Sequence, residues 1–106
     1  MQKVAVITGA SSGIGKACAI ELAKEGYHIA IAARNVDKLN ITKQECETHN
    51  VKALAVKCDV SIEADCIDLI SRTIETFGQI DILVNNAGIS MRAVFNDLDL
   101  SVIKQS

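Results

Sequence analysis

The sequence predicts an α/β fold, in which parallel strands form one sheet and helices cover both of its faces. Two observations predict it: short apolar runs alternate with longer segments of helical periodicity, and these runs are apolar almost throughout. Strands buried on both faces are typical of parallel sheets with right-handed helical crossovers. The 106 residues allow one domain, residues 1–106, and 49% apolar residues are enough for its core.

The elements follow one another as strand and helix in strict alternation. Short β-branched apolar runs predict four strands, at Lys3–Thr8, His28–Ala33, Lys52–Lys57 and Ile80–Val84. Helical spacing predicts three helices and the start of a fourth near Asn96, the three being Ser12–Glu25, Val36–Thr48 and Ile62–Phe77. Glycines at 26 and 78 end the first and third helices. The expected fold is a doubly wound parallel sheet.

Two of these helices have a predicted apolar face. In the first helix the face consists of residues spaced by four, namely Ile14, Cys18 and Leu22. In the third helix it is longer and consists of Ile62, Cys66, Leu69, Ile70, Thr73 and Phe77. The second helix is polar and has a weaker apolar face.

Composition excludes several classes of function. A net charge of −2 gives no reason to expect nucleic acid or an anionic membrane surface as a partner. No apolar run approaches the length of about 18 residues that a membrane-spanning helix needs. The first strand begins too early for a preceding signal peptide, so a cytoplasmic location is predicted.

The cysteines and histidines do not form a metal-binding pattern. The four cysteines, Cys18, Cys46, Cys58 and Cys66, contain no Cys-x-x-Cys pair, and the chain has two histidines. We therefore predict no metal site and reduced, mostly structural thiols, as is usual in a cytosolic protein.

The stretch TGASSGIGK, residues 8–16, follows the first strand and contains three glycines. A Walker A loop would need glycine at Ala10 and serine or threonine at Ala17, so nucleoside triphosphate hydrolysis is not predicted. Gly-x-Gly-x-x-Gly fits at Gly13 and Gly15 and fails at Cys18. The pattern Thr-Gly-x-x-x-Gly-x-Gly fits at every position.

Each glycine of this loop has a physical use in binding a pyrophosphate. Gly9 permits a tight turn out of the strand, Gly13 lets backbone N–H groups approach phosphate oxygens, and Gly15 lies at the anion-attracting N-terminus of the first helix. The predicted contacts are Gly9, Ser11, Ser12, Gly13, Ile14 and Gly15. The alternative is a glycine turn that serves packing alone.

Two further motifs follow later strands. Asp59-Val60 comes after the third strand, and Asn85-Asn86-Ala87-Gly88 comes after the fourth. With the glycine pattern they give three motifs at the carboxyl ends of strands, where open α/β sheets bind ligands. On these motifs the whole chain resembles the short-chain dehydrogenases/reductases, which implies a Rossmann-type sheet and a nicotinamide dinucleotide as cofactor.

The resemblance assigns roles to the two later motifs. It implies that Asp59 accepts a hydrogen bond from the adenine amino group and that the Val60 backbone supports the ring. It also implies that Asn86, Ala87 and Gly88 line the ribose on the nicotinamide side. Structural alternatives stay open: Asp59 could cap the third helix, although Ser61 is better placed as N-cap, and part of the Asn-Asn-Ala-Gly motif is structural.

The end of the second strand bears on the choice between NAD and NADP. An acidic residue there would accept hydrogen bonds from the ribose and repel a 2′-phosphate, but Ala33 occupies this position and Arg34 follows. A guanidinium can hold a phosphate through two hydrogen bonds, so the resemblance favours NADP(H) over NAD(H). The alternatives are that Arg34 is a solvated surface charge and that Asp37 is the acidic residue, although a place in the first helical turn suits Asp37 better.

The catalytic groups of the family are not found. Its Tyr-x-x-x-Lys pair has no counterpart, because Tyr27 is the only tyrosine and Ile31 stands four residues later. No catalytic residue is therefore predicted, and the chain resembles the N-terminal, cofactor-binding half of a reductase, with the flank of its fourth strand uncovered.

The leading hypothesis is an NADP(H)-dependent oxidoreductase acting on a carbonyl or alcohol substrate, with an oligomeric full-length protein. The 106-residue chain alone is expected to be inactive. The alternative is a catalytically inactive nucleotide-binding or interaction module.

Overall fold

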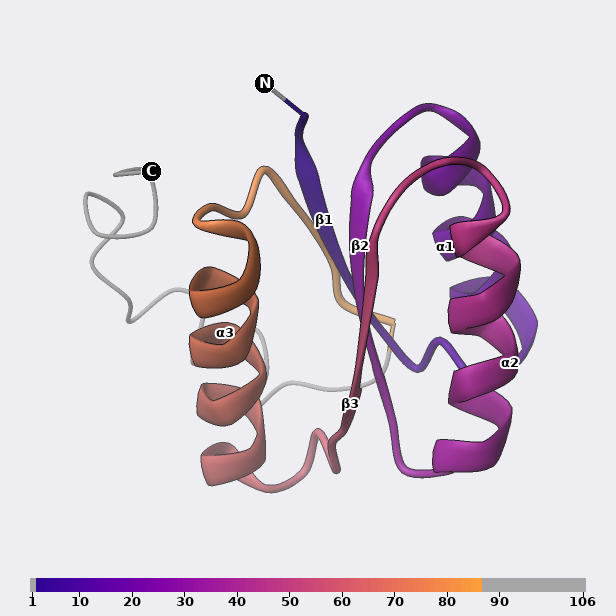
Figure 1. The fold of residues 1–106 in the computed structure, drawn as a ribbon. Helices are drawn as coiled ribbons and strands as arrows, with labels where there is room; N and C mark the ends of the chain where they lie inside the picture. Colours follow the sequence, from indigo (N-terminus) through magenta and orange to yellow (C-terminus); the bar gives the residue numbers. More distant parts are fainter. Residues whose placement is uncertain (1, 87–106) are drawn as a thin grey trace.

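A parallel sheet of four strands, in the order β3-β2-β1-β4, organises the chain. We describe residues 2–86 from a computed structural model (Figure 1). The elements in chain order are β1 (Val4–Thr8), α1 (Gly13–Lys24), β2 (His28–Ala33), α2 (Val36–Glu47), β3 (Ala53–Lys57), α3 (Glu63–Phe77) and β4 (Ile82–Val84). The expected doubly wound α/β sheet is thereby confirmed.

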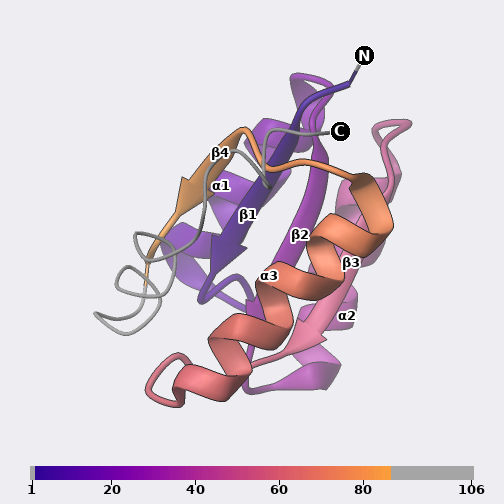
Figure 2. The same cartoon turned by 90° about the vertical axis from the view of Figure 1, so that its left-hand side faces the viewer.

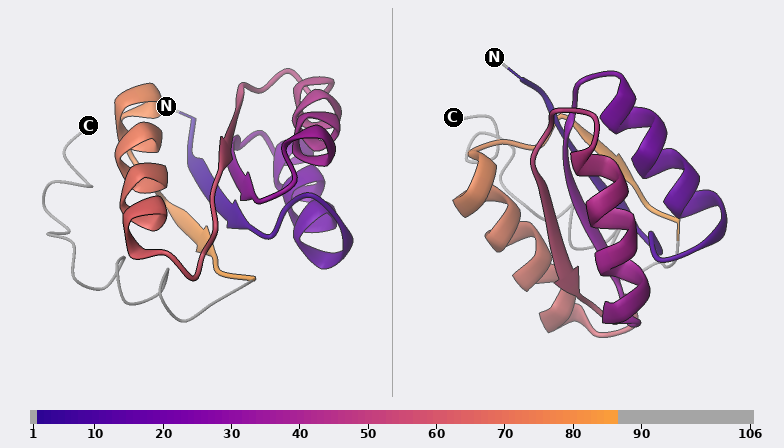
Figure 3. Two further views of the ribbon diagram at one scale, coloured as in Figure 1. Left: turned by 90° about the horizontal axis from the view of Figure 1, so that it is seen from below. Right: turned by 45° about the vertical axis from the view of Figure 1, so that its right-hand side comes forward.

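The helices lie on both faces of the sheet. Helices α1 and α2 cover one face and α3 covers the other, as Figure 1 and the view from below in Figure 3 show. Figure 2 shows the same arrangement with α3 in front of the sheet. Because successive side chains of a strand point to opposite faces, Ala5 and Ile7 of β1 pack in the core below α1 and α2, whereas Val6 packs below α3.

The strand register places the ends of the strands at one edge. Thr8 pairs with Ala32, Ala33 pairs with Lys57, and Ile7 pairs with Val84. Asp81 fixes the start of β4, because its N–H donates to the Val4 carbonyl and its carboxylate accepts from the Val4 N–H, both at 2.8 Å. The three segments that follow β1, β2 and β3 therefore leave the sheet side by side.

The bounds of all seven elements agree with those predicted to within two residues. Several predicted elements begin one residue too early, because their first predicted residue is the one that precedes the observed element. For example, Ser12 is the N-cap of α1 and Ile62 is the N-cap of α3. Gly26 and Gly78 end their helices with φ of 94° and 84°, in the left-handed region that glycine adopts readily.

The apolar face predicted for the first helix is wrong by one position. The residues of α1 that are buried are Gly15, Ala19 and Ala23, whereas the Ile14 side chain is 74% exposed. These residues have no side chain or a small one, which lets α1 approach the sheet and the preceding loop closely. The buried face is therefore the one with the smallest side chains and not the one with the larger apolar residues. For α3 the prediction is confirmed at its centre, with Cys66, Leu69, Ile70 and Thr73 buried.

The predictions of a fourth helix and of no membrane-spanning helix are taken last. The helix expected to start near Asn96 lies outside the described residues. Within residues 2–86, no helix has both the length and the apolar character needed to cross a membrane.

Candidate functional site: a cleft at the carboxyl edge of the sheet

The loops after β1, β2 and β3 enclose a cleft of about 510 Å³ at the carboxyl edge of the sheet. Its lining comes from the glycine loop, the β2–α2 connection and the segment after β3: Gly9, Ser11, Ser12, Ala33, Arg34, Asn35, Cys58, Asp59, Val60 and Ser61. Six predicted site residues thus meet here, namely Gly9, Ser11, Ser12, Arg34, Asp59 and Val60. An elongated anionic ligand could contact all three segments at once.

The glycine loop needs two of its glycines for their backbone conformation. Gly9 and Gly13 have φ of 64° and 61°, which residues with a side chain adopt only with strain. A Cβ on Gly13 would have no neighbour within 4 Å, so the surface there is open to an approaching group. Gly13 begins α1, where unpaired N–H groups and the helix dipole favour an anion.

Gly15 is required for packing. A Cβ at this position would overlap the carbonyl oxygen of Gly9 and would lie 2.9 Å from Nδ2 of Asn86. Gly15 is buried, unlike its neighbours in the loop, and brings α1 against the end of β1. Its position at the helix N-terminus is as expected, while the close approach it permits is to this chain's own backbone.

The Thr8 hydroxyl connects the glycine loop to the end of β4. The Asn86 N–H donates to Thr8 Oγ1 at 3.0 Å, and Asn86 Nδ2 lies 3.5 Å from the Gly9 carbonyl oxygen. Among the described residues Asn86 therefore holds β4 against the loop, the structural role that was left open for part of its motif. The predicted contacts Ala87 and Gly88 lie outside the described residues.

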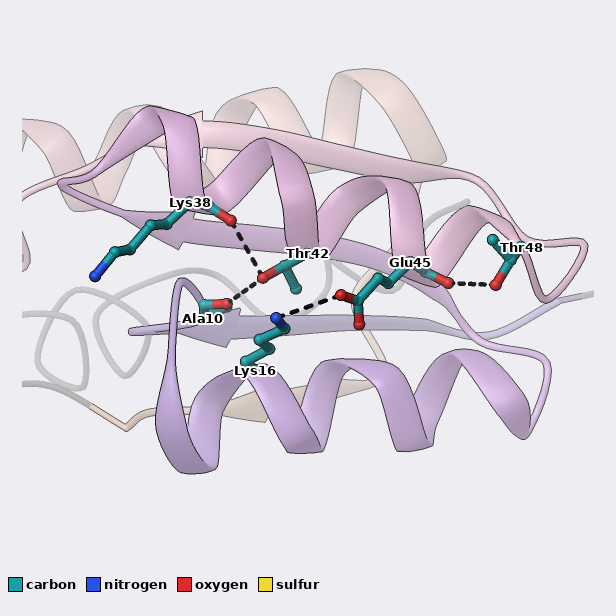
Figure 4. A network of polar contacts seen from close by, with 6 residues as sticks. All are labelled: Ala10, Lys16, Lys38, Thr42, Glu45 and Thr48. Atoms are coloured by element: carbon teal, nitrogen blue, oxygen red, sulfur yellow. Dashed lines mark hydrogen bonds and ion pairs between the residues drawn. The ribbon is translucent and has the colours of Figure 1, made fainter.

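A buried hydrogen bond to the glycine loop escaped prediction. Thr42 of α2 is fully buried, and its hydroxyl donates to the Ala10 carbonyl at 3.0 Å (Figure 4). The sequence offers little signal for it, because a threonine in a polar helix usually bonds to its own helix or to water.

Asp59 is held as an anion in the part of the cleft wall that the segment after β3 contributes. Its Oδ1 accepts hydrogen bonds from the Ser61 hydroxyl at 2.6 Å and from the Ser61 N–H at 2.9 Å. These bonds lower the pKa of the Asp59 carboxyl below its usual value, and the positive charge of Arg34 lowers it further. An ionised carboxylate is a hydrogen-bond acceptor suited to an amino group.

The expectation that Ser61 caps the third helix is wrong. The N-cap is Ile62, whose hydrocarbon side chain cannot accept a hydrogen bond, and the Ser61 hydroxyl donates to Asp59. Asp65 in the first turn of α3 contributes instead by accepting the Asp59 N–H at 2.9 Å. This pair of bonds orders the segment that follows β3.

The β2–α2 connection presents Arg34 at the cleft. Asn35 is the N-cap of α2, and its side chain accepts the Lys38 N–H at 3.1 Å. The rival acidic residue Asp37 lies in the first turn of α2 and is absent from the cleft lining. Arg34 is exposed and is the basic side chain among the residues that line the cleft.

A second hollow of about 330 Å³ adjoins the same loop from the side of α2. It shares Ser11 and Ser12 with the cleft, and it includes Gly13 among its lining residues. Lys16 also lines it, but its ammonium group is paired with Glu45 at 3.3 Å (Figure 4). Ile14 lines neither hollow and is exposed beside them.

Within residues 2–86 no three side chains of the metal-binding types come close enough to hold a metal ion. The cleft lining offers backbone N–H groups, serine hydroxyls, the Arg34 guanidinium and the Asp59 carboxylate for recognition of a ligand.

The sequence profile of the short chain dehydrogenases matches residues 3–106. The chain belongs to the short-chain dehydrogenase family. An uncharacterized oxidoreductase of Staphylococcus epidermidis is 40% identical over 99 residues, covering 93% of this chain and 42% of the relative. The 3-ketodihydrosphingosine reductase of Bos taurus is 41% identical over 105 residues, covering 94% of this chain and 32% of the relative. The chain thus spans less than half the length of these relatives.

Solved structures of family members agree with the fold. L-Sorbose reductase from Gluconobacter frateurii, complexed with NADPH and L-sorbose, has a TM-score of 0.78 and 46% identity, covering 83% of this chain and 34% of that one. Actinorhodin polyketide ketoreductase with NADPH has a TM-score of 0.77 and 39% identity, with the same coverage of 83% and 34%. The short-chain dehydrogenase resemblance and the Rossmann-type fold are both confirmed, and the family is one of oxidoreductases that use nicotinamide cofactors.

Proposed function

We propose that this chain is the cofactor-binding part of an NADP(H)-dependent short-chain dehydrogenase/reductase, whose whole protein transfers hydride between the nicotinamide and a carbonyl or alcohol substrate. When bound, the dinucleotide would donate hydride to a carbonyl or accept it from an alcohol. The residues of this chain bind and orient it. We also propose a cytoplasmic location and an oligomeric whole protein, with no nucleic acid or membrane as partner.

The observation that carries the choice of NADP(H) is Arg34 on the cleft wall, next to Ala33 where an acidic residue would exclude a 2′-phosphate. A phosphate there would be close to a guanidinium and to the hydroxyls of the glycine loop, which are hydrogen-bond donors. Two of the structurally similar enzymes are complexes with NADPH, which is in line with this choice.

The remaining site residues bind different parts of the dinucleotide in this proposal. In this proposal the loop from Gly9 to Gly15 binds the pyrophosphate, and Asp59 with Val60 binds the adenine. The anionic state of Asp59 supports its role as acceptor for the adenine amino group. Asn86, Ala87 and Gly88 border the ribose on the nicotinamide side.

Isothermal titration of the chain with NADPH and with NADH tests the proposal. We expect NADPH to bind at least about tenfold more tightly, because a charge-assisted hydrogen bond contributes about 1.5–3 kcal/mol. Arg34→Asp should abolish or invert this ratio. Arg72→Asp is the matched control, since it makes the same charge change on α3, away from the cleft. A ratio that stays the same in Arg34→Asp would refute the assignment of NADP(H).

A further inference from the structure

We infer that Thr42 is a positioning residue for cofactor binding, which acts by fixing the peptide between Ala10 and Ser11 in the glycine loop. This inference rests on the proposed function, because it concerns how the same loop receives a pyrophosphate.

The Ala10 residue is held from two sides by different elements. Its N–H donates to the Ala32 carbonyl of β2 at 3.2 Å, and its carbonyl accepts the Thr42 hydroxyl of α2 at 3.0 Å. The hydroxyl is also 3.4 Å from the Lys38 carbonyl of its own helix, so the shorter contact is the one to the loop (Figure 4). Ala10 and Thr42 are both fully buried.

This bond determines the direction of a donor. In a trans peptide the C=O and the N–H point in opposite directions, and residues 2–86 contain no cis peptide. Since the Ala10 carbonyl points to α2, the Ser11 N–H of the same peptide points away from α2. Within the described part of the chain this N–H forms no hydrogen bond, and Ser11 lines both hollows beside the loop. It is therefore free to donate to an anionic ligand.

The loop would not hold this peptide in place unaided. Ala10 and Ser11 lie between Gly9 and Gly13, two glycines in the left-handed region whose backbone is easily rotated. Without the hydroxyl, the buried Ala10 carbonyl loses its partner, which costs free energy unless the peptide turns toward water. Such a turn would also move the Ser11 N–H away from the ligand.

Thr73 provides an internal comparison. It is also a fully buried helical threonine, and its hydroxyl donates to the Leu69 carbonyl of its own helix at 2.7 Å. Loss of that hydroxyl removes a local bond in α3, on the opposite face of the sheet from α2 (Figure 3). A purely structural role for Thr42 would make the two threonines equivalent.

The test compares nucleotide affinity and thermal stability in Thr42→Val, Thr42→Ser and Thr73→Val, with calorimetry performed well below each melting temperature. We expect Thr42→Val to raise the Kd of NADPH and of NADH by the same factor, about tenfold, because both ligands carry the pyrophosphate and one buried donor–acceptor arrangement is lost. Thr42→Ser keeps the hydroxyl and should bind within about twofold of the wild type. Thr73→Val should lose stability and keep its affinity.

The outcomes separate this inference from the proposed function. Wild-type affinity in Thr42→Val, or equal changes in affinity in Thr42→Val and Thr73→Val, would overturn the role of Thr42 while cofactor binding stands. A wild-type chain that binds neither nucleotide would overturn the proposed function. Where the valine variant does not fold, Thr42→Ala removes the same hydroxyl donor from the Ala10 carbonyl, and the same loss of affinity is expected from it.

Nuclear magnetic resonance gives a second readout at the donor itself. The Ser11 amide resonance should move on saturation with NADPH in the wild type and in Thr42→Ser. If the Ser11 amide resonance of Thr42→Ala moved on saturation with NADPH as far as it does in the wild type, the inference would be contradicted. A threonine with a merely structural role would leave this shift unchanged.

Discussion

Substitution of Gly15 by alanine tests how closely α1 approaches the sheet. The new Cβ would overlap the Gly9 carbonyl oxygen and lie 2.9 Å from Nδ2 of Asn86. Because the obstacle at Gly9 is backbone, it cannot rotate away, and α1 or the loop has to move. Overpacking of this kind costs about 1–3 kcal/mol, and we expect the upper end here.

The higher helix propensity of alanine offsets part of this destabilisation. Alanine is up to about 1 kcal/mol more favourable than glycine in a helix interior, which is the upper limit for Gly15 in the first turn of α1. The net loss in the free energy of unfolding should therefore be about 2 kcal/mol, measured by urea denaturation followed by circular dichroism at constant m. The movement of the loop should also weaken nucleotide binding.

Gly26→Ala is the matched control for Gly15→Ala. Gly26 has φ of 94° and its Cβ would have no neighbour within 4 Å, so only backbone strain of about 1–2 kcal/mol applies. It lies at the opposite end of α1 from the site, and nucleotide affinity should stay at the wild-type value. A Gly15→Ala chain as stable as the wild type, with unchanged affinity, would refute the packing argument.

Three further predictions concern pH, thiols and activity. Burial lowers the pKa of His28, whose Nδ1 accepts the Lys52 N–H and whose ring stacks on Phe77, and the Lys52 charge lowers it further. The unfolded chain, in which the histidine pKa is near 6.5, binds a proton at His28 more readily than the folded chain does. The free energy of unfolding should therefore be greatest above pH 6.5, and it should fall as the pH drops from 6.5 toward the lower pKa of the folded state. Urea midpoints between pH 5 and 8 measure this, and His28→Asn should flatten the curve; an equal slope in the variant would contradict it. Burial raises the pKa of Cys46 to about 11 and of Cys58 to about 12, and also raises that of Cys66. Iodoacetamide on the native chain should therefore modify the half-buried Cys18 first, and mass spectrometry showing simultaneous modification of all four thiols would count against the buried positions. Finally, the 106-residue chain contains no Tyr-x-x-x-Lys pair, so it should bind NADPH without oxidising it in the presence of a carbonyl compound, and turnover by a sample of verified mass would contradict this.

The order of the elements could be predicted because buried parallel strands leave a plain pattern. Runs such as His28–Ala33 are apolar at almost every position, and glycines at 26 and 78 mark helix ends. The three motifs could be assigned to one edge for the same reason, since parallel strands end together. The family resemblance then supplied roles that spacing alone does not contain.

What escaped prediction depends on contacts between distant residues. The buried face of α1 is made of Gly15, Ala19 and Ala23, and apolar periodicity is dominated by larger side chains such as Ile14. The hydrogen bond from Thr42 to Ala10 joins residues that are 32 positions apart in the sequence, so no local pattern predicts it. Ser61 was expected as a cap from local preference, but the nearby Asp59 carboxylate is the stronger acceptor for its hydroxyl.

The most direct measurement is to map the amide resonances of the chain on titration with NADPH. We expect the largest shifts around the cleft, at Gly9, Ser11, Ser12, Arg34 and Asp59. NADH should produce the same pattern with a smaller change at Arg34. Shifts confined to the outer surface of α3, or no shifts at saturating NADPH, would contradict the claim that this edge of the sheet is a dinucleotide site.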